Sequence, residues 1–240
     1  MRCLKVLFLL SALASVALPA GAATIYVATP ANGGSDTTGN GSESQPYATI
    51  QFAFNQAVDN DTIMVGEGTY TECLFLSGVL NGGPLSQLSV NLVASAFDAG
   101  NPDTRLLTVL DGSPCPAGYS TVNVGGFNSS IEGFKIVGGT TGGIWNIGGV
   151  AITNNVIEGN ISTAGGGIYS YPDNCFYGSV NVSITNNLIR SNVVSYVSSS
   201  LGGLGGGILA GLYPEEFFVG DPLTTADGCL GGGGTVLIED

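Results

Sequence analysis

Histidine is absent from the 240-residue sequence, and only 5 Lys and Arg residues stand against 18 Asp and Glu residues. A chain with so few cations cannot neutralise phosphates, so its composition argues against a nucleic acid partner and against an anionic membrane surface. Acidic polysaccharides are repelled for the same reason unless Ca²⁺ bridges the two. The lack of histidine, together with the long spacing of the cysteines, also argues against a zinc site.

The N-terminus has the features of a signal peptide. Arg2 and Lys5 precede an apolar run over residues 7–18, and Ala20-Gly21-Ala22 has the small-x-small pattern that a signal peptidase needs. The run is too short for a comfortable membrane span, and no later stretch is typical of a transmembrane helix. We therefore expect residues 1–23 to be a signal peptide, with cleavage after Ala22 or Ala23, and the protein to be secreted or at the cell surface.

The mature chain is more acidic than the precursor, because its three remaining basic residues face all 18 acidic ones, a net charge of −15. These three residues are Arg105, Lys135 and Arg190.

The sequence repeats itself. Residues 150–160, VAITNNVIEGN, match residues 182–192, VSITNNLIRSN, and each copy is followed by a Gly-Gly-Gly-Ile turn and strand. A degenerate earlier copy covers residues 131–136, and a further copy begins at Val236 and is cut off at Asp240. We expect the chain to be truncated at this C-terminal end. A fixed internal period indicates a stack of repeated units rather than one globular core.

The shortest spacing between copies, 21 residues from Ile131 to Ile152, suits one coil of three short strands. The corners of such a coil need residues that tolerate positive φ, as Asn and Gly do. Two asparagine pairs recur at the same corner and are predicted to stack as a structural ladder, with ligand binding as the alternative reading. These are Asn154, Asn155, Asn186 and Asn187.

Two insertions, residues 172–181 and 212–235, leave the repeat at equivalent corners, and each carries one cysteine. The mature chain has four cysteines, which allow three disulfide connectivities in an exported protein. The shared corner favours a Cys175–Cys229 bond, which leaves Cys73 to pair with Cys115.

Residues 24–72 differ from the repeats and are predicted to form an N-terminal cap with the first coil. A short strand over 24–27 and a polar loop precede residues 47–58, which read as one amphipathic helix. Its apolar face is predicted to carry Ile50, Phe54, Ala57 and Val58. A stack of strands needs such a cap because its open end exposes unpaired backbone and apolar interior.

The opening order of strand, Gly/Ser loop, Pro46-Tyr-Ala-Thr-Ile-Gln helix and Gly68-Thr-Tyr-Thr-Glu turn resembles that of pectate-lyase-like right-handed β-helix proteins. The Val-x-Ile-Thr-Asn-Asn-x-Ile copies are similar to the parallel β-helix repeats of that superfamily. The resemblance implies an all-β fold, a right-handed parallel β-helix or solenoid with an N-terminal capping helix, whose coils occupy residues 73–240. It does not imply one activity, because the superfamily includes lyases, hydrolases and non-catalytic surface proteins.

Three groups of residues are candidates for a site. In the strand after each glycine turn, Trp145 and Tyr169, with Tyr171, are predicted to point outward as an aromatic platform for glycans, unless the insertions cover them. A possible Ca²⁺ site would use the loop carboxylates of Asp173, Asp221 and Asp227, which otherwise are solvated loop acids. Glu158 and Arg190 occupy one register position in adjacent coils, which favours an ion pair over a catalytic role for Arg190.

From these observations we expect a secreted or cell-surface scaffold that is non-catalytic in this part of the chain and that either binds polysaccharide or cell-surface glycan or serves in adhesion. The alternative is a polysaccharide lyase or glycoside hydrolase acting on acidic polysaccharide. Those enzymes need a cation and a base, or a close pair of carboxylates, and the sequence shows neither clearly.

Overall fold

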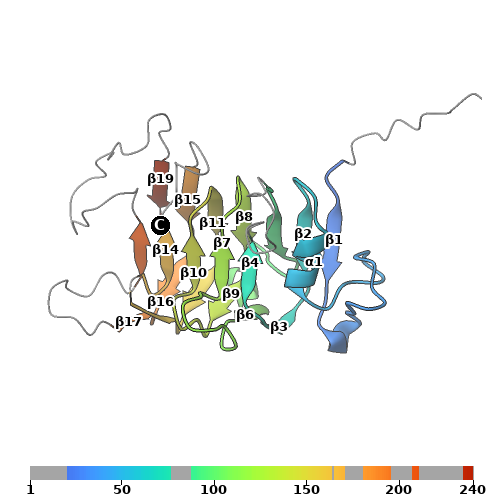
Figure 1. Cartoon of the computed structure of the whole chain (residues 1–240), viewed down its shortest axis with the longest axis horizontal. Coiled ribbons are helices and arrows are strands. Elements are labelled where there is room, and N and C mark those ends of the chain that lie inside the picture. Colours follow the sequence, from blue (N-terminus) through green and yellow to red (C-terminus); the bar gives the residue numbers. More distant parts are fainter. Residues whose placement is uncertain are drawn as a thin grey trace, which may run out of the picture.

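The computed structural model of the chain describes residues 21–76, 88–163, 165–170, 181–195, 207–210 and 235–239. Within these residues the structure is mostly β, with stacked parallel sheets and one α-helix, α1 (Ile50–Gln56), near the N-terminus (Figure 1). The prediction of an all-β fold with one helix is confirmed. Two 3-10 helices, η1 (Pro30–Asn32) and η3 (Pro102–Leu106), lie in the connections.

The described strands form three large sheets and one small one. The first sheet contains, in spatial order, β1 (Thr24–Val27), β2 (Thr62–Val65), β5 (Asn91–Ala94), β8 (Ser129–Glu132), β11 (Val150–Thr153), β15 (Asn181–Thr185) and β19 (Thr235–Glu239). The second contains β3 (Gly68–Thr71), β6 (Thr108–Asp111), β9 (Lys135–Val137), β12 (Val156–Glu158) and β16 (Leu188–Arg190). The third contains β4 (Leu74–Leu76), β7 (Val122–Val124), β10 (Ile144–Asn146), β14 (Ile168–Ser170) and β18 (Ile208–Ala210). The small sheet pairs β13 (Ile161–Ser162) with β17 (Val193–Val194).

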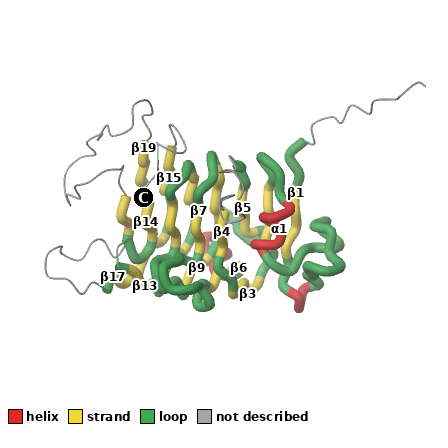
Figure 2. Tube along the Cα trace, viewed as in Figure 1, coloured by secondary structure: helices red, strands yellow, loops and turns green. Residues whose placement is uncertain are grey.

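From β2 onward the chain visits the first, second and third sheets in that order, and each round adds one parallel strand to each sheet (Figure 2). We call one such round a coil. The register agrees with the predicted repeat, since Ile152 pairs with Ile131 on one side and with Ile184 on the other. The copy that begins at Val236 also takes its place, because β19 pairs with β15 over its whole length.

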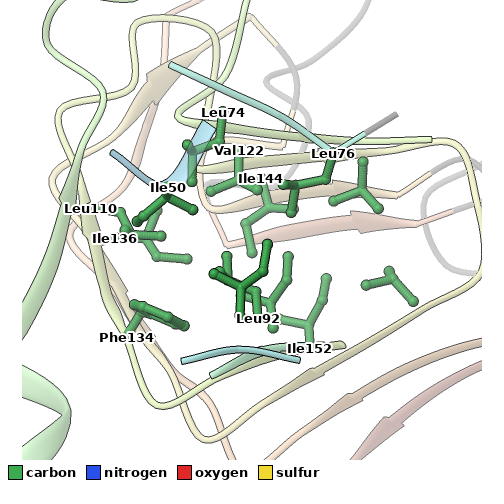
Figure 3. Packing of buried hydrophobic residues seen from close by; sticks show 14 of the residues in the cluster. Ile50, Leu74, Leu76, Leu92, Leu110, Val122, Phe134, Ile136, Ile144 and Ile152 are labelled. Carbon is green, nitrogen blue, oxygen red and sulfur yellow. The ribbon is translucent and has the colours of Figure 1, made fainter. Parts of the chain in front are cut away.

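The interior of the stack is a column of aliphatic side chains that the three sheets supply together (Figure 3). Leu92, Ile131 and Ile152 succeed one another in the first sheet and are fully buried, while Ile136 and Ile144 face them from the other two sheets. Because inward side chains alternate along each strand, every coil adds a few such residues to the core. Burial of each stabilises the fold by about 1.5–3 kcal/mol.

The glycine turns have a steric reason. A Cβ atom on Gly143 would lie 2.7 Å from the carbonyl oxygen of Gly167 and 2.8 Å from Cγ2 of Ile157. One coil later, a Cβ on Gly167 would lie 2.6 Å from the oxygen of Gly207 and 2.7 Å from Ile189. The Gly-Ile pattern therefore recurs because successive backbones approach too closely here for any side chain.

The two asparagines of each pair at this corner have different roles. Asn154 and Asn186 adopt positive φ, 57° and 55°, whereas Asn155 and Asn187 form the ladder. Asn155 accepts from the Phe134 backbone and donates to carbonyls of its own coil and the preceding one, and Asn187 repeats this pattern one coil on. The predicted stacking is seen for Asn155 and Asn187, whose side chains bond to each other, while the Asn154 side chain donates to Glu132 Oε1 one coil earlier at 2.8 Å.

Helix α1 lies near the N-terminal end of the stack and contacts β1, β2 and β4 (Figure 1). It is shorter than predicted, because the Thr49 side chain caps its first turn and the backbone becomes extended at Ala57. Ile50 and Phe54 are buried as expected, but Val58 is 50% exposed, so its place on the apolar face was wrong. Among the described residues no helix has the length and apolar character to cross a membrane.

Candidate functional site

The outer face of the third sheet carries two neighbouring aromatic side chains. Trp145 on β10 and Tyr169 on β14 are partners in the parallel register, between buried residues on either side in their strands. Trp145 is 36% exposed and Tyr169 is partly exposed, whereas Ile144 and Ile168 before them are fully buried. Adjacent strands lie about 4.8 Å apart, so the two rings follow one another along the stack.

These two rings line a surface hollow of about 250 Å³ together with three hydroxyl side chains. The hydroxyls belong to Thr141, Ser162 and Thr163. Ser162 lies on β13, the short strand that follows the second sheet in its coil, and Thr141 lies in the connection before β10. No charged residue is among the five that line this hollow.

Hydrogen bonds between coils hold the rim of the hollow. The Ser162 hydroxyl donates to the Thr141 carbonyl at 3.1 Å, and the Ile161 amide donates to the Gly139 carbonyl at 2.8 Å. Below them, the Asn160 side chain accepts from the Gly139 amide and donates to the carbonyl of Ile136. Hydrogen bonds to the backbone of the preceding coil therefore hold this part of the rim.

Partial burial raises the pKa of the Tyr169 hydroxyl above its ordinary value of 10.0. The phenol therefore remains protonated at neutral pH and is able to donate a hydrogen bond to a ligand oxygen.

The aromatic row ends at Trp145 on its N-terminal side. The next register position is Asn123 on β7, which is only 5% exposed and bonds to the carbonyls of Leu74 and Ser120. The loop that covers it is tied down by the Cys73–Cys115 disulfide, which confirms that predicted pairing. On the other side Leu209 is the register partner of Tyr169.

Several predicted site residues lie outside the described residues. This holds for Tyr171 in the platform, for the three proposed Ca²⁺ ligands Asp173, Asp221 and Asp227, and for Cys175 and Cys229. The two predicted insertions lie there too, apart from Asn181 and Thr235, which begin β15 and β19. In the part of the chain that the structure describes, no three His, Cys, Asp or Glu side chains gather as a metal site.

The second sheet carries a group of opposite charges away from the hollow. Glu158 on β12 lies between two cations: its Oε2 is 2.7 Å from Arg190 Nε on β16, and its Oε1 is 2.8 Å from Lys135 Nζ on β9. Lys135, then Arg190, lower the pKa of the Glu158 carboxyl. The register had pointed to the Glu158–Arg190 pair, but the Lys135 contact was missed, because Lys135 lies diagonally across from Glu158 rather than opposite it.

Arg105, the third basic residue of the described chain, lies in η3 and also has partners. Its Nε donates to the Pro102 carbonyl at 2.7 Å, and its Nη1 donates to the Asn186 carbonyl at 3.3 Å. All three of these cations are thus engaged in structural contacts, and none of them lines the hollow.

Carboxylates near the N-terminus also have structural roles. Asp36 accepts from the Ala48 and Thr49 amides and from the Thr49 hydroxyl, and Glu72 accepts from the Ile50 and Gln51 amides at the start of α1. Burial, more than the charge of Asp36, raises the pKa of Glu72. Asp61 is 2% exposed and accepts two backbone N–H groups.

No protein-family model matches the chain, and no curated protein and no solved structure is significantly similar to it. The function is therefore argued from the hollow and its lining.

Proposed function

We propose that the chain is a secreted or cell-surface right-handed parallel β-helix scaffold of the pectate-lyase-like kind, and that the hollow on its third sheet binds a neutral glycan. Two features support the fold: three sheets visited in constant order and an asparagine ladder at one corner. Connections between parallel strands are right-handed in nearly all proteins, which supports the hand. The Cys73–Cys115 disulfide favours an oxidising compartment outside the cytosol.

The observation that carries the proposed ligand is the pair of rings beside three hydroxyls. Sugar rings have apolar C–H faces that stack on aromatic side chains and hydroxyl groups at their edges that need hydrogen-bond partners. Trp145 and Tyr169 supply two consecutive faces along the stack, and Thr141, Ser162 and Thr163 supply the polar partners. A glycan chain running along the axis of the stack would meet both rings in succession.

Charge favours a neutral glycan over an acidic one. None of the described residues that line the hollow is cationic, and the net charge of the chain is −13. An uronate polymer would therefore be repelled by the protein as a whole and would find no counter-charge at the rings. The described lining residues also include no pair of carboxylates, the groups that glycoside hydrolysis uses, so we propose binding without cleavage.

The test is a glycan array probed with the mature protein, followed by calorimetry on each hit. We expect binding to neutral polysaccharides and no binding to uronate polymers. Trp145→Ala and Tyr169→Ala should each weaken binding about tenfold or more, since each removes one stacking face. Tyr169→Phe keeps the face and should lose less.

Val58→Ala is the matched control, because Val58 is exposed beside α1, several coils from the hollow. Binding that survives Trp145→Ala unchanged would refute the site. An absorbance assay for unsaturated product, run with and without Ca²⁺ on acidic polysaccharides, tests the alternative: product formation would replace the binding proposal by a lyase.

A further inference from the structure

Asp61 is a buried carboxylate at the very start of the fold. It is 2% exposed, its Oδ1 accepts from the Ala23 amide at 2.7 Å, and its Oδ2 accepts from the Val58 amide at 2.8 Å. A carboxylate withdrawn from water is costly unless it is hydrogen-bonded and paired with opposite charge. In the unprocessed chain it has the two hydrogen bonds, but both donors are neutral.

The residue that approaches Asp61 stands at the predicted cleavage site. Gly21, Ala22 and Ala23 are exposed and precede β1, and the small-x-small pattern Ala20-Gly21-Ala22 allows cleavage after Ala22. In that reaction water attacks the Ala22 carbonyl carbon, and the bond to the Ala23 nitrogen breaks. Ala22 leaves with a carboxylate, and the Ala23 nitrogen takes up protons to become an ammonium at neutral pH.

We propose that Asp61 is the binding site for the mature N-terminus, so that removal of the signal peptide turns the Ala23–Asp61 hydrogen bond into a partly buried ion pair. The nitrogen already lies at hydrogen-bond distance, so the pair forms without movement of the chain. Charge-assisted hydrogen bonds are about twice as strong as neutral ones. Processing would therefore fasten β1 to β2 at the end of the stack. The inference rests on the proposed export of the chain and not on glycan binding.

The same geometry selects between the two cleavage positions that the sequence allows. The Ala23 carbonyl accepts from the Thr62 amide at 2.8 Å, which continues the pairing of β1 with β2. Cleavage after Ala23 would remove both this acceptor and the nitrogen that faces Asp61. The mature chain should thus begin at Ala23 and not at Thr24.

One experiment expresses the whole sequence, including its own N-terminal leader, in a bacterial host and measures the intact mass of the exported protein. A chain that begins at Ala23 is expected; one that begins at Thr24, or that keeps its leader, would overturn the proposal. Because glycan binding is measured separately, failure here leaves the function of the hollow to be decided by its own test.

A second experiment measures the ion pair by unfolding four full-length mature chains in denaturant. Two chains begin at Ala23, and two carry a Gly-Ala extension before Ala23 in place of the leader. In each pair, one chain keeps Asp61 and the other carries Asp61→Asn. The free terminus should lower the unfolding equilibrium constant about tenfold in the Asp61 chains and less than twofold in the Asp61→Asn chains. Equal effects in both backgrounds would contradict the pair. If Asp61→Asn does not fold, an N-acetylated chain that begins at Ala23 replaces it, and it should lose the tenfold difference.

Discussion

At the scale of single residues, the two asparagines of each repeated pair have different roles. Asn154 supplies a backbone conformation, φ of 57°, while Asn155 is fully buried and bonds to three backbone groups in two coils. The pattern recurs at Asn160, whose side chain bonds to Gly139 and Ile136 at the next corner. This second ladder was missed although Asn160 and Asn192 align in the repeat, because one asparagine beside a glycine also fits an ordinary turn.

Substitutions at the first pair should therefore separate the two roles. Asn155→Ala leaves the buried Phe134 amide without its acceptor and frees two carbonyls, so we expect a loss of about 3 kcal/mol in the free energy of unfolding. Asn154→Gly keeps the left-handed corner and removes only the side-chain hydrogen bond to Glu132, so it should lower the free energy of unfolding by about 1 kcal/mol or less. Denaturant unfolding measures both, and equal losses at the two positions would contradict the assignment.

Two carboxylates should give the stability opposite dependences on pH. The pKa of Glu158 is lowered by Lys135 and Arg190, so its contribution is present above the ordinary value of 4.5 and is lost as pH falls through the lowered pKa. The pKa of Glu72 is raised by burial, so its contribution is present below 4.5 and is lost as pH rises through the raised pKa.

The measurement is the difference in unfolding free energy between the parent and each Gln variant across pH 3–7. For Glu158→Gln the parent's advantage should shrink as pH falls, and it should stay below about 1 kcal/mol because the ion pairs are at the surface. For Glu72→Gln the parent's advantage in unfolding free energy should shrink as pH rises. Parallel curves for the two variants would show that these carboxyl groups do not titrate as assigned.

At the scale of elements, the start of α1 is held by side chains from three segments. Asp36 and Glu72 accept the amides of the helix entrance, and Thr49 accepts from Phe52 while donating to Asp36. The helix has only seven residues, a length at which an isolated helix is not stable in water. Its stability thus comes from these caps and from the burial of Ile50 and Phe54.

Removal of the cap should therefore lower the stability of the whole protein. Thr49→Ala is expected to lower the free energy of unfolding by about 1 kcal/mol, since it removes both the cap acceptor and the donor to Asp36. Thr49→Ser keeps the hydroxyl and serves as the control in thermal unfolding. If the two variants are equally destabilised, packing of the methyl group and not the cap explains the effect.

Sequence alone predicted those elements whose signal is repeated. The strands around Ile131, Ile152 and Ile184 were found because the same residues recur at one register position. The two coils before them were not found as repeats, since Ile63 and Leu92 share only burial with the later copies and no asparagine pair marks their corner. The end of α1 depends on the Val58 amide bonding to Asp61, a contact that no periodicity reveals.

At the scale of the whole molecule, the stacking of coils places residues from successive repeats side by side on one surface. Outward positions of the same register become neighbours, so Trp145 and Tyr169, 24 residues apart in sequence, face the same solvent. The alternation of the strand predicted this pair from sequence. The hydroxyls of Thr141 and Ser162 were not predicted, because Thr141 lies in the connection before β10 and Ser162 on the short strand β13, and the places of both depend on the corners of the coil.

The most direct test of the glycan site uses the fact that Trp145 is the single tryptophan of the chain. Its fluorescence reports on the hollow alone, so the protein is titrated with the neutral oligosaccharide that binds best on the array. The account predicts a saturable change in emission and weaker quenching by acrylamide in the complex, both largely lost in Tyr169→Ala and kept in Val58→Ala. Binding seen by calorimetry with no change in Trp145 emission or quenching would place the ligand elsewhere and contradict the account.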